Sequence, residues 1–159
     1  MVAELTTRLQ SGNAEERMET AEEISDIFEY GNSRLDDVER IVSTLIEAAV
    51  AETDEYTRET MLDALSNAEI RYGPIAGPWE KLARAMSSFD AKSLDLALTV
   101  LSFTYNPAFR VSILPYLNHG AATVRESARY ALAELGVLPK ESIDRAVATC
   151  QGVLTHRKP

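Results

Sequence analysis

The sequence predicts a single all-α domain over residues 1–159, built from about four stacked helix pairs and a C-terminal helix. Three observations lead to this fold class. Apolar residues recur at the 3.6-residue period of an amphipathic helix, and two-residue alternation is nearly absent. Turn-forming residues interrupt the pattern at regular intervals. The composition, 45% hydrophobic and 26% charged, is that of a globular chain long enough to bury a sizeable core.

The first two helices are separated by the Ser-Gly-Asn segment at 11–13. Asn13 and Glu16 have capping-box spacing, so the asparagine oxygen is expected to accept an orphan backbone amide while the glutamate reaches back to the Asn13 amide. Gly31 follows the second helix and is suited to the left-handed position that often ends a helix.

The third helix has an apolar stripe from 38 to 50, and the fourth begins at Thr53-Asp54. Two Gly-Pro pairs in the segment 73–78 then form a short turn before Trp79. This tryptophan is a possible anchor for a partner, but a large aromatic residue after a turn more often packs against the next helix. We therefore expect Trp79 to be buried.

The remaining helices are bounded by further breaks. Asn106-Pro107 reads as a cap followed by proline at the first helical position. Gly136 and Pro139 end the eighth helix. The pattern predicts eight helices of about 9 to 19 residues and a ninth from Lys140 to about Thr155.

One segment of the chain resembles a HEAT repeat closely. The family pattern is an apolar first helix, a turn, and a second helix reading V-R-x-x-A-x-x-A-L-x-x-L. The first helix here contains Pro115, as HEAT first helices often do. The second helix matches at Val124, Arg125, Ala128, Ala131, Leu132 and Leu135.

Weaker copies of the same pattern centre on Ala21, Met61 and Ala97. Together with Ala128, these anchors are 40, 36 and 31 residues apart, so the later units are shorter than a usual HEAT repeat. The resemblance to the HEAT family covers nearly the whole chain. It implies a right-handed α-α superhelix in which each helix pair stacks on the next, and it specifies no activity.

Charge is unevenly distributed along the chain, whose net charge is −9. Residues 1–72 carry 18 acidic and 6 basic side chains, whereas residues 73–159 carry 7 acidic and 10 basic ones. A strongly acidic half repels the phosphate backbone of nucleic acids and attracts basic proteins. The alternative is that the acidic surface serves solubility alone.

Acidic residues of the second helices recur on one face, at the positions two before, two after and five after each anchor. The positions two before and two after each anchor lie about 200° from it around the helix, so they point away from the core. HEAT second helices line the concave side of the array, so the resemblance implies an acidic concave face without interleaved lysine. The candidate partner-binding residues are Glu19, Glu23, Asp26, Glu59, Asp63, Asp95, Glu126 and Tyr130.

Residue patterns for catalysis, cofactors or metals are not found. The sequence has no glycine-rich phosphate loop, and its two histidines, His119 and His156, lie in a turn and a polar tail. Cys150 belongs to an apolar helical pattern. HEAT-type hydroxylases carry His-Glu pairs and HEAT-type DNA glycosylases a basic groove, and this sequence has neither. We therefore predict no catalytic, cofactor or metal site.

The sequence also bears on the compartment. No apolar run approaches the roughly 20 residues needed to span a bilayer, and the segment 1–10 lacks the features of a secretory signal. A single cysteine excludes an internal disulfide framework. These features predict a cytoplasmic protein without membrane contact.

Three functional classes remain open. The first is a protein-binding module, monomeric when free, that captures a basic partner with its acidic face. Its sharpest version is an immunity protein that neutralises a basic bacterial toxin. The second is a general scaffold or adaptor. The third is a lyase-like HEAT enzyme, which requires a pocket with convergent buried polar groups.

Overall fold

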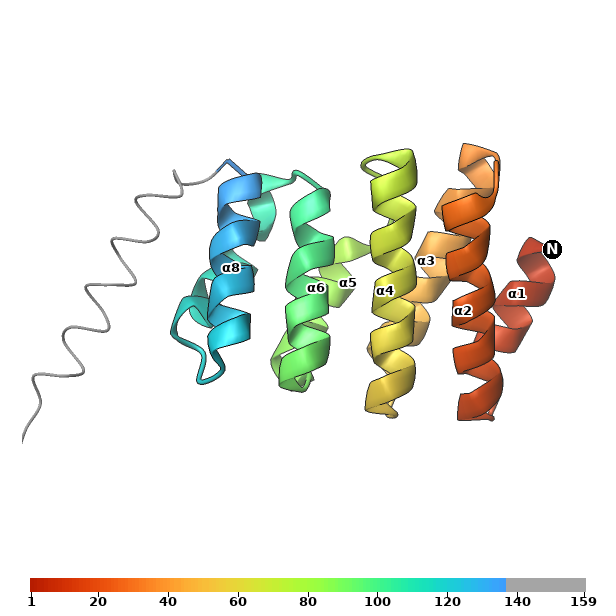
Figure 1. The fold of residues 1–159 in the computed structure, drawn as a ribbon, viewed down its shortest axis with the longest axis horizontal. Helices are drawn as coiled ribbons and strands as arrows, with labels where there is room; N and C mark the ends of the chain where they lie inside the picture. Colours follow the sequence, from red (N-terminus) through yellow and green to blue (C-terminus); the bar gives the residue numbers. More distant parts are fainter. Residues whose placement is uncertain (137–159) are drawn as a thin grey trace, which may run out of the picture.

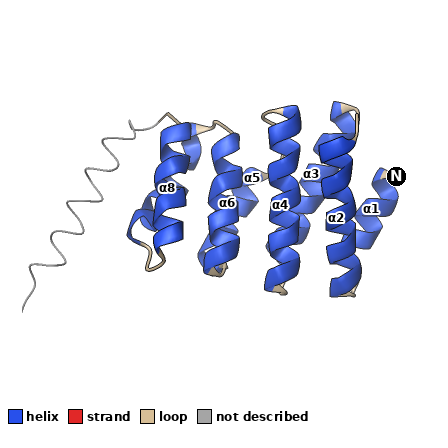
Figure 2. Cartoon of the chain, viewed as in Figure 1, coloured by secondary structure: helices blue, strands red, loops and turns tan. Residues whose placement is uncertain are grey.

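The computed structural model describes residues 1–136, and within that part of the chain it contains eight α-helices and no strand (Figure 2). The predicted helix at 140–155, with Cys150 and His156, lies outside the described residues. The α-helices are α1 Val2–Leu9, α2 Ala14–Tyr30, α3 Leu35–Ala51, α4 Glu55–Tyr72, α5 Trp79–Ala85, α6 Ala91–Phe103, α7 Arg110–Ile113 and α8 Ala122–Glu134.

The helices form two layers (Figure 1). In the first layer α2, α4, α6 and α8 lie side by side and run in the same direction, and each contacts the next. We call this layer the row. In the second layer α1, α3, α5 and α7 lie behind the row, each in contact with its neighbours. The predicted all-helical fold of packed neighbouring helices is therefore confirmed.

The four predicted anchors all lie in the core between the layers. Ala21, Met61, Ala97 and Ala128 each have 0% of their surface exposed. An alanine at the contact lets two helices approach closely, and Met61 is one of the largest fully buried side chains of the core. The stripe predicted for α3 is buried except at its last residue: Val50 is half-buried, and the others, Val38, Ile41, Val42, Leu45, Ile46 and Ala49, are at most 1% exposed.

From α3 onwards, the helices of the second layer become shorter along the chain. From α3 to α5 to α7 their lengths are 17, 7 and 4 residues, so the predicted minimum of about 9 is wrong for α5 and α7. Short 3₁₀ helices complete the later units: η1 Met86–Ser88, η2 Pro107–Phe109 and η3 Leu114–Asn118. Pro107 is the first residue of η2 and Pro115 the second residue of η3, and a proline has no amide for a continuing α-helical ladder.

The helix ends agree with the sequence in part. Asn13 accepts a hydrogen bond from the Glu15 amide at 3.0 Å, as expected for a cap. Glu16 bonds the Ser11 hydroxyl instead of the Asn13 amide, so the capping box is only half formed. Gly31 is extended, with φ −80° and ψ 172°, so its predicted left-handed conformation is wrong. Glycine is needed there because a Cβ would lie 2.2 Å from the Ile27 carbonyl oxygen.

Candidate protein-binding face

The predicted partner-binding residues lie on the four row helices, and all but Glu23, which faces α1, are assigned to the side of the row that faces away from the second layer. We call this side the row face. None of the eight is buried, and Glu59 and Asp95 are the two that are half-buried. Indexing the row helices from their anchors therefore identified the solvent-facing side of all four.

The middle of the row face is hollowed into a groove of about 530 Å³ that crosses α2, α4 and α6. We call it the row groove. It brings together three of the predicted residues, Asp26 from α2 and Glu59 and Asp63 from α4. It also contains Glu22, which sequence indexing missed because this residue lies one position past the anchor Ala21. Four carboxylates from two neighbouring helices thus share one hollow.

Other predicted residues have partners away from the groove. Glu23 forms an ion pair with Arg8 at 2.5 Å, on the side of α2 that faces α1. Asp95 accepts a hydrogen bond from the Ser127 hydroxyl and so links α6 to α8. Glu126 lies 4.0 Å from Arg129, one turn along α8. The predicted acidic face is therefore continuous in position, but its carboxylates converge only between α2 and α4.

One lysine interrupts the carboxylates, contrary to the expectation of a face without interleaved lysine. The Lys92 ammonium at the start of α6 lies 3.8 Å from the Glu59 carboxylate, and its side chain is 68% exposed. Lys92 lies five residues before its anchor, a position that the indexing did not include. The groove consequently has an acidic wall on α2 and α4 and a mixed wall on α6.

A hydrogen bond joins the two helices of the acidic wall. The Asn67 side-chain amide of α4 donates to the Ser25 hydroxyl of α2 at 2.7 Å. Ser25 also lines the groove. Because this bond connects polar atoms between adjacent helices, it fixes the register of α2 against α4, and with it the spacing of the carboxylates above.

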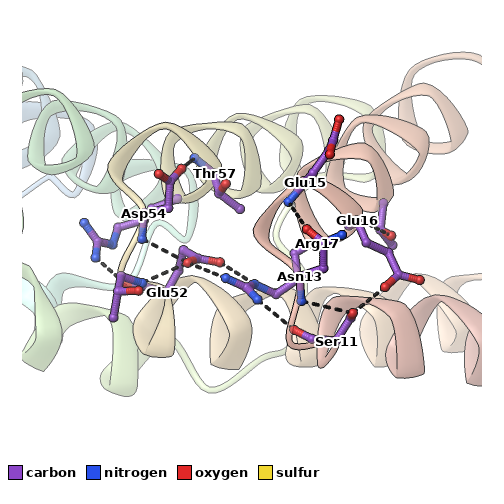
Figure 3. Close-up of polar contacts among 11 residues, drawn as sticks. Ser11, Asn13, Glu15, Glu16, Arg17, Glu52, Asp54 and Thr57 are labelled. Atoms are coloured by element: carbon purple, nitrogen blue, oxygen red, sulfur yellow. Dashed lines mark hydrogen bonds and ion pairs between the residues drawn. The ribbon is translucent and has the colours of Figure 1, made fainter.

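A polar network at the starts of the row helices also holds α2 and α4 together (Figure 3). Arg17 of α2 donates two hydrogen bonds to the carboxylate of Glu52, from Nε at 2.7 Å and from Nη2 at 2.9 Å. The same carboxylate accepts the amides of Thr53 and Asp54 at 2.9 and 3.0 Å. The Glu52 side chain is only 1% exposed, so these hydrogen-bond donors, and not water, stabilise its negative charge.

The electrostatics of Glu52 follow from this geometry. Burial by itself raises the pKa of a carboxyl group, but the hydrogen bonds from Arg17 and from the two amides outweigh burial and hold the pKa of Glu52 below its usual value. Arg58 extends the network, because it donates to the Glu52 carbonyl oxygen and lies 3.5 Å from the Asp90 carboxylate at the start of α6. The network thus reaches three successive row helices and serves to position them.

Glu69 on α4 is, like Glu52, a buried acid that sequence analysis did not single out. It is 3% exposed, and neither carboxylate oxygen has a hydrogen-bond partner within residues 1–136. Burial raises its pKa to about 8. The nearby backbone amide of Ile75 favours the charged carboxylate and so opposes this rise in pKa, but only in part. The α4–α5 connection containing Ile75 is itself fixed, because the Trp79 indole donates to the Ile75 carbonyl oxygen at 2.8 Å.

The expected burial of Trp79 is confirmed, since the residue is 5% exposed. Its possible role as a partner anchor is therefore not supported. His119 lies in the turn before α8, where its Nδ1 accepts a hydrogen bond from the Ala121 amide at 3.1 Å. This bond gives the histidine a local structural role.

In the described part of the chain, no three His, Cys, Asp or Glu side chains are grouped so that they could hold a metal ion. None of its helices combines the length and apolar character needed to cross a membrane.

Comparison with known proteins identifies a fold and no family. No protein-family model matches the chain, and no curated protein matches it. Two crystal structures from a structural genomics consortium, each described as an engineered protein, are similar to it, with TM-scores of 0.60 and 0.59. Their sequences are 18% and 19% identical to this one. Both alignments cover 96% of this chain, but 68% and 41% of the respective engineered chains. At such identities the likeness concerns the fold alone.

Proposed function

We propose that this chain is a HEAT-like right-handed α-α superhelix that acts as a non-enzymatic protein-binding module, with the row face as its concave binding surface. The convergence of four carboxylates in the row groove is the observation that carries this proposal. Like charges on adjacent helices oppose folding by a few tenths of a kcal/mol per exposed pair, at typical magnitudes. A positively charged partner relieves that repulsion.

The chemistry of the groove selects a basic protein as the partner. The net charge of −9 favours association with cations and disfavours nucleic acid. The more specific proposal is that the protein acts in the cytoplasm as an immunity protein and that the partner is a basic toxin. Small size, acidic charge and an all-helical fold support that version by analogy. A general scaffold or adaptor role is the alternative.

Affinity capture with charge-reversal variants tests the binding module. The purified protein serves as bait in its source lysate at low and moderate salt, and the affinity of the captured protein is then measured. We expect Glu59→Lys with Asp63→Lys to weaken binding at least tenfold, chiefly through slower association. Glu80→Lys with Glu134→Lys, at exposed sites outside the groove, makes the same change in net charge and serves as the control.

The two sets of variants separate a local from a general charge effect. Equal weakening by both pairs shows that only net charge matters and contradicts the assigned face. Unchanged affinity in the groove variants contradicts the row groove as the binding site, and failure to capture any protein contradicts the module itself. The toxin version makes an additional prediction, that the captured partner inhibits growth when expressed alone and loses this effect when the protein is co-expressed.

A further inference from the structure

Exposed apolar side chains lie at both ends of the acidic wall. At one end, Tyr56 of α4 is 64% exposed and lines the row groove. At the other end, Tyr30 of α2 is 77% exposed and Ile70 of α4 is 68% exposed. All three side chains are large, and because they are exposed they are not part of the core between the two helix layers.

Tyr30 and Ile70 occupy equivalent positions on neighbouring helices. Each lies eleven residues after a predicted partner-binding acid of its helix, Glu19 in α2 and Glu59 in α4, and nine after its buried anchor. Eleven residues are just over three helical turns, so both side chains continue the line of the carboxylates on the row face. Single exposed apolar residues are normal on protein surfaces, but two in register on adjacent helices form a patch.

The length of the surface follows from helix geometry. Tyr56 and Ile70 are fourteen residues apart on α4, which corresponds to about 21 Å at the 1.5 Å rise of an α-helix. The carboxylates of Glu59 and Asp63 lie between them on the same helix face, and those of Glu22 and Asp26 lie across the groove. Along α2 and α4 the surface is therefore apolar, then acidic, then apolar.

We propose that the row groove binds one amphipathic α-helix of the partner protein, about fourteen residues long, with basic side chains at its middle and apolar side chains at both ends. This inference rests on the proposed function and specifies the shape and chemistry of the partner. The helix lies over the row groove and runs along the boundary between α2 and α4, so that one of its ends extends beyond the groove to Tyr30 and Ile70. Its lysines or arginines face the four carboxylates, and its terminal apolar residues contact Tyr56 at one end and Tyr30 and Ile70 at the other.

Backbone hydrogen bonding favours a helix over an extended segment. An extended peptide has unpaired amides and carbonyls, which need a strand edge or other polar groups to receive them. Residues 1–136 provide no strand, and Ser25 and Asn67 in the acidic wall already bond one another. A helix satisfies its own backbone, so it needs only side-chain contacts from the groove.

The charges of the groove also set the orientation of the helix within it. Lys92 lies on the α6 wall and repels a basic side chain, whereas the α2 and α4 walls carry the four carboxylates. The basic side chains of the partner therefore face the α2–α4 boundary and not the α4–α6 boundary. Leu96 on α6 provides an apolar contact on the far side.

A designed peptide tests this inference without knowledge of the natural partner. The probe is an alanine-based helical peptide of 18 residues with fluorescein at its N-terminus, four lysines on one face of its central turns and leucines on that face at each end. The comparison peptide has the same composition with lysines at the ends and leucines in the middle. Binding to the full chain is measured by fluorescence anisotropy.

We expect the probe to bind at least tenfold more tightly than the comparison peptide. Tyr30→Ala with Ile70→Ala is expected to remove that preference, and so is Tyr56→Ala. Val111→Ala, at a residue that is 71% exposed on the second-layer helix α7, is the matched control and is expected to leave the preference unchanged. Circular dichroism of each variant verifies that it is folded.

The alternative outcomes distinguish this inference from the proposed function. Equal binding of both peptides, lost on Glu59→Lys with Asp63→Lys, overturns the helix proposal and leaves an acidic binding face. A preference that survives the Tyr30, Ile70 and Tyr56 substitutions also overturns it. Failure of both peptides to bind overturns the helix proposal, and the lysate capture described above then decides the module separately.

Discussion

Arg17 in α2 and Arg125 in α8 lie in the first turn of their helices, and both hold the loop that precedes them. Arg17 donates to the Ser11 carbonyl oxygen at 2.7 Å. Arg125 donates to the carbonyl oxygens of His119 and Gly120 at 2.7 and 2.9 Å. The two regions differ in the reach of the arginine. Arg17 also donates to the buried Glu52 carboxylate just before α4, whereas these two bonds of Arg125 go only to the loop before its own helix.

The middle of the row shows where the change occurs. Arg58 of α4 repeats the pattern, with one bond to the Glu52 carbonyl oxygen and an ion pair to Asp90. In α6 the corresponding position is Leu94, an uncharged residue that is 2% exposed and cannot form an ion pair with the next row helix. The first half of the row is thus joined by buried charges, and the second half by apolar packing and the Asp95–Ser127 hydrogen bond. An arginine that binds the preceding loop therefore occurs in both halves of the row, but only in the first half does it also bind a carboxylate outside that loop.

Glu52→Ala is expected to lower the free energy of unfolding most, because Glu52 is the centre of the buried network in the first half of the row. The substitution leaves the Arg17 guanidinium and the Thr53 and Asp54 amides without their acceptor, and removing one partner of a buried pair typically costs about 3–5 kcal/mol. We expect a loss of about 3 kcal/mol in the free energy of unfolding at pH 7, measured by urea denaturation. A loss below about 1 kcal/mol contradicts the network's role.

The double variant Glu52→Met with Arg17→Met is the control for that experiment. It removes both charges, and we expect it to recover part of the lost stability. The pKa of Glu52 is lowered in the folded state, so its contribution is present above the unfolded-state pKa and is lost as pH falls through the folded-state pKa. The gap between wild type and the double variant should therefore narrow in acid.

Glu69→Gln tests the connection between the two halves. The pKa of Glu69 is raised to about 8, so the folded state binds more protons than the unfolded state between the ordinary carboxyl range and pH 8. Stability therefore falls as pH rises through that window, and a neutral glutamine removes the fall. We expect the variant to be more stable than wild type by about 1–3 kcal/mol at pH 8.5.

Trp79 is the only tryptophan of the chain, so its fluorescence reports on this connection directly. Urea denaturation followed at Trp79 from pH 5 to 9 is the measurement. A wild-type stability that does not decline between pH 6 and 8, or declines equally in Glu69→Gln, shows that another group is responsible.

Arg125→Ala is expected to have a smaller effect, because its bonds to the His119 and Gly120 carbonyl oxygens are local. Hydrogen bonds from a charged group contribute about 1.5–3 kcal/mol in favourable cases, and Arg125 is only half-buried, so we expect a loss of about 1–2 kcal/mol. Arg17→Ala, measured by the same urea titration, should cost more. Equal losses for the two variants remove the distinction between linked and local arginines.

Lys81→Ala is expected to change the stability least among these variants. The ion pair of Lys81 with Glu47 joins α5 to α3, but the two side chains are 52% and 54% exposed. Exposed pairs contribute about 0–1 kcal/mol and are screened by salt. We expect a change within about 0.5 kcal/mol that vanishes in 1 M salt, measured by thermal denaturation. A loss comparable to that of Glu52→Ala shows that burial does not govern these interactions.

Periodicity predicted the helices and the buried anchors, because a 3.6-residue apolar pattern is a local property of the sequence. It did not identify the network, because Glu52 and Arg17 are 35 residues apart and Arg17 lies four positions before its anchor, where Arg58 and Arg125 lie three before theirs. It did not identify the groove in full either. Glu22 and Lys92 enter the groove through the spacing of adjacent helices, which no single-helix index contains.

The shortening of the second layer, from 17 residues in α3 to 7 in α5 and 4 in α7, has a consequence for local unfolding. In a stacked array each unit is held by its own contacts and by its neighbours. Shorter helices bury less apolar surface, so the free energy of local opening should decrease from α4 towards α8. Amide hydrogen exchange then follows a gradient along the row, with the slowest protons in α3 and α4 and faster exchange in α7 and α8.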